Sequence, residues 1–190
     1  MHPLSASRLI EAFSAPGDWV LDPFCGSGTV LLEARLLGRR AVGVDINPLA
    51  AKIAWLKARG VDSAVAPRLL EAAKQVAAGA DERRLKKAGP THPYPPADRE
   101  LFDVHVLLEL DSLRFYIDQI PREDLRLPLE LVLSAILIKV SRRASDTAAG
   151  MPPKRIAAGY TAKLFVRKTE ELLNRCKEIE ERLSGAPKVR

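Results

Sequence analysis

The strongest constraint on the fold is a glycine-rich turn, Asp22 to Gly28, that joins two apolar segments. Val20-Leu21 before the turn predicts a short strand, and the apolar spacing after it predicts a helix over 29–37 that ends at Gly38. Glycine in such a turn lets the backbone approach a neighbouring group closely, because there is no Cβ to collide. The order strand, turn, helix is typical of the first unit of a parallel α/β sheet.

The same order of elements then repeats once. Ala41 to Val44 predicts a second short strand, which ends at Asp45. Pro48 suits the first turn of a helix that runs to about Arg59 and is stopped by Gly60. The fold class predicted from these elements is α/β: a partial Rossmann-like core followed by a helical region.

The segments outside these two units predict helices. Residues 6–13 predict a short amphipathic helix entered through Ser5, and residues 61–88, rich in alanine and charged residues, predict another. Residues 89–96 contain four prolines and predict a stiff linker. Three further helices are predicted, over 104–120, 125–141 and 161–183.

No convincing third strand follows Asp45, so the sequence predicts a pair of parallel strands. Two parallel strands cannot bury both of their faces or satisfy their edges. We therefore expect either an unusual covering by the helical region or further strands from another polypeptide. The predicted division is a ligand-binding half over 1–60, a helix and linker over 61–100, and a helical region with a basic C-terminal part over 101–190.

Two ligands commonly use a turn of this kind, dinucleotides and S-adenosylmethionine. The dinucleotide pattern requires a third glycine three residues after Gly28, and Leu31 stands there instead. Asp22, at the end of the first strand, would repel a pyrophosphate but can pair with the ammonium group of a methionine moiety. Asp45, at the end of the second strand, can accept hydrogen bonds from both ribose hydroxyls. The residues therefore favour S-adenosylmethionine.

Asp22-Pro23-Phe24-Cys25-Gly26-Ser27-Gly28-Thr29, followed by Gly38-Arg39-Arg40-Ala41-Val42-Gly43-Val44-Asp45-Ile46-Asn47-Pro48, resembles the cofactor-binding half of the amino-group DNA methyltransferases. These enzymes modify adenine N6 or cytosine N4. The resemblance implies an S-adenosylmethionine-dependent methyltransferase core, and residues 101–145 resemble a helical insertion of larger bacterial adenine-specific methylases. The cofactor-binding residues that it implies are Pro3, Leu4, Ser5, Asp22, Pro23, Phe24, Cys25, Gly26, Ser27, Gly28, Thr29, Asp45, Ile46 and Asn47.

The chain departs from this family in its catalytic loop. Family members carry Asp, Asn or Ser before Pro-Pro and an aromatic residue, which holds and stacks the flipped base. Here Pro93-Tyr94-Pro95-Pro96 has the wrong order and Pro152-Pro153 is followed by Lys154. We therefore assign no catalytic residue and expect either a split enzyme, whose second polypeptide supplies the loop, or the N-terminal fragment of a longer enzyme. Two alternatives stay open: an RNA methyltransferase, and a non-catalytic scaffold subunit of the same fold.

The charge is unevenly distributed. Of the 30 basic and 24 acidic residues, 12 basic and 6 acidic ones lie in residues 141–190. A local basic excess attracts polyanions, so DNA is the expected partner. The expected phosphate contacts are Arg142, Arg143, Lys154 and Arg155.

Other features exclude function classes. The two cysteines and three histidines lack metal-ligand spacing, so no metal site is expected, and Cys25 is expected to be a packing residue and not a nucleophile. No segment predicts a membrane span or a secretory signal, and the expected compartment is the cytoplasm.

Overall fold

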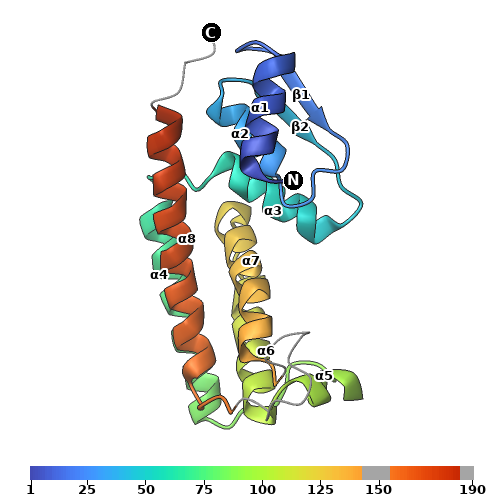
Figure 1. Ribbon diagram of the computed structural model, residues 1–190. Helices are drawn as coiled ribbons and strands as arrows, with labels where there is room; N and C mark the ends of the chain where they lie inside the picture. Colours follow the sequence, from blue (N-terminus) through green and yellow to red (C-terminus); the bar gives the residue numbers. More distant parts are fainter. Residues whose placement is uncertain (143–154, 185–190) are drawn as a thin grey trace. The chain divides into compact units, whose positions relative to one another are not determined.

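The computed structural model describes residues 1–142 and 155–184. These residues are mostly helical and include two strands, which confirms the mixed α/β class (Figure 1). The chain forms two compact units. Unit 1 comprises Met1–Ser63 and the residues from Leu173 onward, and unit 2 comprises Ala64–Leu172. The sequence-based division at residues 60 and 100 stays a prediction.

The sheet of unit 1 consists of β1 (Trp19–Asp22) and β2 (Arg40–Gly43), which are parallel. The register pairs Trp19 with Arg40 and Asp22 with Gly43, so the two strands end level with each other. Both predicted strands are thus confirmed, and among the described residues no third strand joins them.

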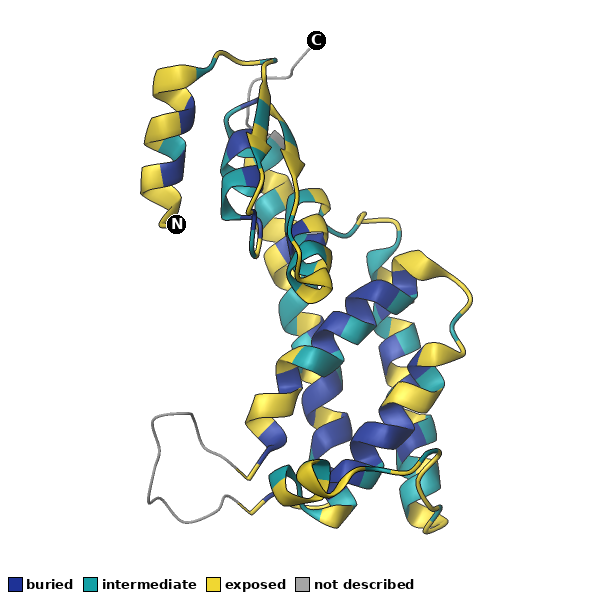
Figure 2. Cartoon of the chain, turned by 90° about the vertical axis from the view of Figure 1, so that its right-hand side faces the viewer, coloured by how far each residue is buried: buried dark blue, intermediate teal, exposed yellow. Residues whose placement is uncertain are grey.

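Unit 1 also contains three helices: α1 (Pro3–Phe13), α2 (Thr29–Leu36) and α3 (Pro48–Arg59). Leu31 of α2 and Ala54 of α3 form a small buried core with Cys25, against which Ala41 of β2 packs. Both helices therefore cover the same face of the sheet (Figure 2).

The ends of the unit 1 helices follow their capping residues. Asn47 Oδ1 accepts a hydrogen bond from the backbone N–H of Leu49 at 3.0 Å, and Gly60 ends α3 with φ 75°. The prediction that Ser5 opens the first helix was wrong. Helix α1 begins at Pro3, because His2 Nδ1 accepts from the Leu4 N–H at 3.3 Å and proline at the first helical position has no N–H to satisfy.

Unit 2 is helical. It contains α4 (Ala66–Leu85), α5 (Pro96–Leu101), α6 (Val104–Asp118), α7 (Glu123–Val140) and the start of α8 (Tyr160–Ser184). The sequence missed α5 and placed the start of α7 too late. Pro128 lies inside α7, whose first turn carries the acidic residues Glu123 and Asp124 that complement the helix dipole. No described helix has the length and apolar character required to cross a membrane.

Two buried carboxylates of α6 hold loop segments in place. Asp111 accepts hydrogen bonds from Thr91 Oγ1 and from the Tyr94 hydroxyl, both at 2.7 Å, which fixes the proline-rich segment against the helices. Glu109 accepts from the backbone N–H groups of Gly159 and Thr161 at 2.5 and 3.2 Å, and so caps the start of α8.

Candidate cofactor-binding site

The glycine-rich turn closes over the carboxyl ends of both strands. The Val44 N–H donates to the Asp22 carbonyl at 2.9 Å, and the Cys25 N–H donates to the Val44 carbonyl at 3.0 Å. The Gly28 N–H donates to the Cys25 carbonyl at 2.8 Å and leads into α2. These bonds extend the β1–β2 pairing into the turn, so that Asp22 and Asp45 follow adjacent strands at the same edge of the sheet.

Three glycines serve this geometry in different ways. Gly26 has φ +51°, and a Cβ there would meet no atom within 4 Å, so its surroundings are open. Gly28 has φ +78°, and a Cβ there would lie 2.7 Å from Ala54 Cα, so glycine allows the turn to touch α3. At Gly43 a Cβ would lie 2.5 Å from Leu31 Cδ1. This role of Gly43 was not predicted from the sequence, although a glycine inside a strand often marks such a close approach.

Each of the two predicted carboxylates is half-buried and bonded to the backbone of the turn. Asp22 Oδ1 accepts from the Phe24 N–H at 3.1 Å. Asp45 Oδ2 accepts from the Gly26 N–H at 2.8 Å, and Asp45 Oδ1 accepts from the Asn47 N–H at 2.8 Å. A carboxylate has about four acceptor positions. Both side chains are therefore held in place and retain capacity to accept hydrogen bonds from a ligand.

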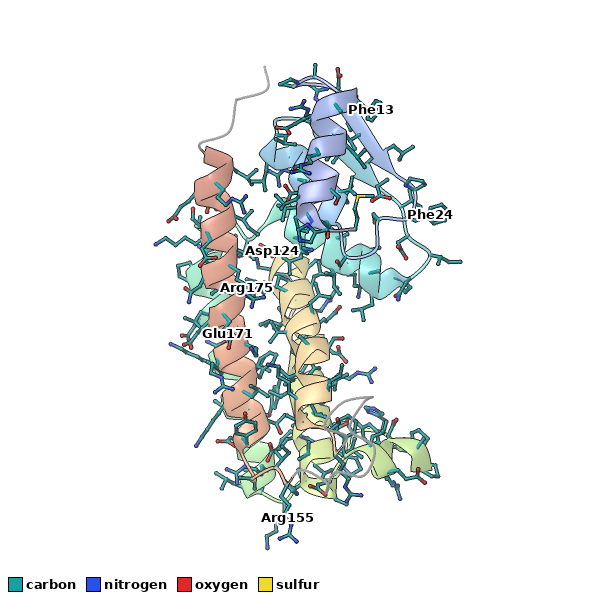
Figure 3. All side chains as sticks on the ribbon, viewed as in Figure 1. Phe13, Phe24, Asp124, Arg155, Glu171 and Arg175 are labelled. Carbon is teal, nitrogen blue, oxygen red and sulfur yellow. The ribbon has the colours of Figure 1, made fainter. Side chains whose placement is uncertain are left out.

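Two large apolar side chains lie exposed at the same edge. Phe24, which follows Asp22 by two residues and is labelled in Figure 3, is 88% exposed. Ile46, next to Asp45, is fully exposed. Apolar surface beside a few fixed polar groups is the composition of a small-molecule site.

Cys25 packs inside the turn. Its side chain is buried with Leu31 and Ala54. Burial raises the pKa of the Cys25 thiol, and the charges of Asp45 and Asp22 raise it further. The protonated thiol is a poor nucleophile, which supports the interpretation of Cys25 as a packing residue.

The remaining predicted cofactor residues lie at helix ends. Pro3, Leu4 and Ser5 form the first turn of α1, and the N terminus lies at the same end of unit 1 as the carboxyl ends of the strands (Figures 1 and 2). Thr29 begins α2, whose N terminus has no side-chain cap. The Asn47 side chain caps α3, so its amide oxygen is already used. Pro23 and Ser27 are exposed on the turn.

The predicted phosphate contacts are placed only in part. The Arg142 guanidinium forms an ion pair with Asp103 at 2.8 Å, and the Arg142 N–H donates to the Leu101 carbonyl. Arg155 is exposed in unit 2 (Figure 3). Arg143 and Lys154 lie outside the described residues. Among the described residues, no group of three or more His, Cys, Asp and Glu side chains could hold a metal ion.

Comparison with known proteins places the similarity at this site. The model of the DNA methylase family matches residues 3–55. The chain is 48% identical over 42 residues to the type II methyltransferase M.MthZI of Methanothermobacter thermautotrophicus, a match that covers 22% of this chain and 12% of the relative. It is 52% identical over 44 residues to the type II methyltransferase M.EcaI of Enterobacter cloacae, covering 23% and 10%.

A third relative modifies RNA. The chain is 61% identical over 31 residues to the tRNA (guanine(10)-N2)-dimethyltransferase of Methanothermobacter thermautotrophicus, covering 16% of this chain and 9% of the relative. The chain thus spans about a tenth of the length of these relatives. No solved structure matches it. Residues 3–55 are thus similar in sequence to the amino-group DNA methyltransferase family.

Proposed function

We propose that this chain binds S-adenosylmethionine and is the cofactor-binding part of a DNA amino-group methyltransferase, with adenine as its target. The observation that carries the proposal is the position of two fixed carboxylates, Asp22 and Asp45, at the carboxyl ends of adjacent parallel strands, beside the open turn at Gly26. In this interpretation the two strands are the first part of a Rossmann-like sheet.

The residues of the turn fit the chemistry of this cofactor. Asp22 pairs with the ammonium group of the methionine moiety, and Asp45 accepts hydrogen bonds from the two ribose hydroxyls. The exposed side chains of Phe24 and Ile46 offer apolar surface to the adenine ring. The first turn of α1, Pro3 to Ser5, is proposed to lie near the carboxylate of the cofactor's methionine moiety. When bound, the cofactor supplies an electrophilic methyl group.

The base-binding loop is proposed to come from a second polypeptide, which makes the active enzyme a heteromer. The aromatic residue of the nearest sequence approach, Tyr94, is committed to unit 2, because its hydroxyl donates to the buried Asp111 at 2.7 Å. Arg143, Lys154 and Arg155 are proposed to contact DNA phosphates. Arg142 contributes less, because contact with a phosphate competes with its ion pair to Asp103.

Calorimetric titration with S-adenosylmethionine tests the cofactor site. Asp45→Ala is expected to weaken binding by about 30- to 700-fold, because two hydrogen bonds to a charged group are lost at about 1–2 kcal/mol each. Glu11→Ala, which removes one exposed charge from α1, is the matched control and should bind as the wild type does. Equal affinity of Asp45→Ala and the wild type would contradict the assignment.

RNA is the second candidate substrate, because a tRNA-modifying enzyme shares 61% identity over the 31 residues that it matches. Transfer of a labelled methyl group by the chain together with its partner polypeptide separates the two. Incorporation into unmethylated duplex DNA supports the proposal, and incorporation into structured RNA alone contradicts it.

A further inference from the structure

One face of the two-stranded sheet is apolar and exposed. Trp19 and Leu21 of β1 are 64% and 65% exposed, and Val42 and Val44 at β2 are 43% and 56% exposed. The register pairs Leu21 with Val42, and side chains two residues apart on a strand lie on the same face. These four residues therefore form one continuous surface, the open sheet face, opposite the face that α2 and α3 cover.

The outer edge of β1 is also open. The Arg40 N–H donates to the Asp18 carbonyl and the Val44 N–H donates to the Asp22 carbonyl, so the even-numbered residues of β1 point toward β2. The backbone groups of Trp19 and Leu21 consequently point to the other edge, because successive residues of a strand alternate in direction. Within residues 1–142 and 155–184, β1 pairs with β2 alone.

An exposed apolar sheet face next to an unpaired strand edge is an unfavourable arrangement in water. Parallel strands are normally buried on both faces, and an open edge next to exposed apolar side chains is a template for pairing with another chain. The exposed side chains lie together on one sheet and are not scattered singly, which is the pattern of an interaction surface.

We propose that the open sheet face and the outer edge of β1 are the docking surface for a second polypeptide. This polypeptide adds a strand parallel to β1 and lays the aliphatic side of a helix over Trp19, Leu21, Val42 and Val44. That it carries the base-binding loop rests on the proposed function; the surface itself does not. The segments that the chain matches cover 12% and 10% of the two type II relatives, whose remaining sequence can hold such elements.

The charge of this surface favours a different polypeptide over a second copy. The Arg40 guanidinium lies 5.6 Å from the centre of the Trp19 ring, so the open sheet face carries a cation. The acidic residue of β1, Asp22, lies on the opposite face, because successive side chains of a strand alternate. Two copies packed through this face would bring like charges together, whereas a helix with a carboxylate near Arg40 would be complementary.

Site-specific photo-crosslinking tests the surface in the full chain. The probe is p-benzoylphenylalanine in place of Leu21, introduced in the cells from which the gene comes, with the cross-linked peptides identified by mass spectrometry. The expected adduct joins position 21 to a different polypeptide that contains a Pro-Pro-aromatic loop. The same probe in place of Ile138, a 72% exposed apolar residue of unit 2, should not give this adduct. A probe at Trp19 repeats the test should the variant at position 21 fold poorly.

Leu21→Glu and Trp19→Glu separate this proposal from the cofactor site. Each should reduce recovery of the partner at least about tenfold and leave the affinity for S-adenosylmethionine unchanged. An adduct with a second copy of the chain, no adduct, or recovery unchanged in both variants overturns the docking proposal. An adduct with a different polypeptide that lacks the loop overturns the assignment of the base-binding loop to the partner and leaves the docking surface standing. If the unsubstituted chain does not bind S-adenosylmethionine but the expected adduct still forms, the proposed function alone is overturned.

Discussion

The two glycines of the turn provide a test in which the same substitution has different consequences. Both residues have positive φ, so alanine at either position loses about 1–2 kcal/mol in backbone conformation. At Gly28 the new methyl group also overlaps Ala54, with 2.7 Å to Cα and 2.8 Å to Cβ. Overpacking of this kind costs about 1–3 kcal/mol more. Gly28→Ala should therefore lower the free energy of unfolding of unit 1 by about 2–5 kcal/mol, and Gly26→Ala by about 1–2 kcal/mol.

The assay can isolate unit 1, because the chain contains two tryptophans and both of them, Trp19 and Trp55, lie in that unit. Urea unfolding followed by tryptophan fluorescence gives its stability, and circular dichroism of the helices monitors unit 2 as the control. For cofactor affinity we expect the opposite order, with the larger loss in Gly26→Ala and the smaller loss in Gly28→Ala. Gly26→Ala places a methyl group in the open space beside Asp45 and should weaken S-adenosylmethionine binding at least about tenfold. Equal losses of stability for the two variants would contradict the role of Gly28 in the contact with Ala54. Unchanged affinity for S-adenosylmethionine in Gly26→Ala would contradict the position of the cofactor beside Gly26.

Three further outcomes follow from the structure. Asp45→Asn, which keeps one acceptor oxygen, should bind S-adenosylmethionine with an affinity between those of the wild type and Asp45→Ala in the same titration. Burial alone would raise the pKa of Asp111, but hydrogen bonds from Tyr94 and Thr91 lower it. Asp111→Asn should thus destabilise unit 2 by about 1–3 kcal/mol above pH 4, and the difference in thermal unfolding should shrink as the pH falls and the wild-type carboxylate is protonated. The raised pKa of Cys25 predicts alkylation by iodoacetamide at pH 8 at least about tenfold slower in the folded chain than in urea, measured by peptide mass spectrometry.

The sequence predicted local elements well where strong local signals act. Glycine at the turn and at Gly38 and Gly60 marked the ends of elements, and Pro48 marked the start of a helix. Prediction was weaker where contacts between distant parts of the chain determine the local structure. Helix α7 continues through Pro128, and the proline-rich segment docks through Thr91 and Tyr94 onto Asp111, some 20 residues away.

The candidate site shows the same limit. The pattern identified Asp22 and Asp45 as end-of-strand carboxylates, because each directly follows an apolar run. It could not show that Asp45 also holds the Gly26 N–H, or that Gly43 is required by Leu31, because both contacts join segments from different elements. The sequence likewise could not show that Arg142 pairs with Asp103, because the two residues are 39 positions apart.

A ¹⁵N-resolved NMR titration of the full chain with S-adenosylmethionine tests the position of the cofactor site residue by residue. We predict that the amide signals of Phe24, Gly26 and Asn47, whose N–H groups contact the two carboxylates, shift saturably. The amides of Gly159 and Thr161, held by Glu109 in unit 2, should stay in place. No shifts at millimolar cofactor, or shifts confined to unit 2, would contradict the assignment of the cofactor site to the ends of β1 and β2.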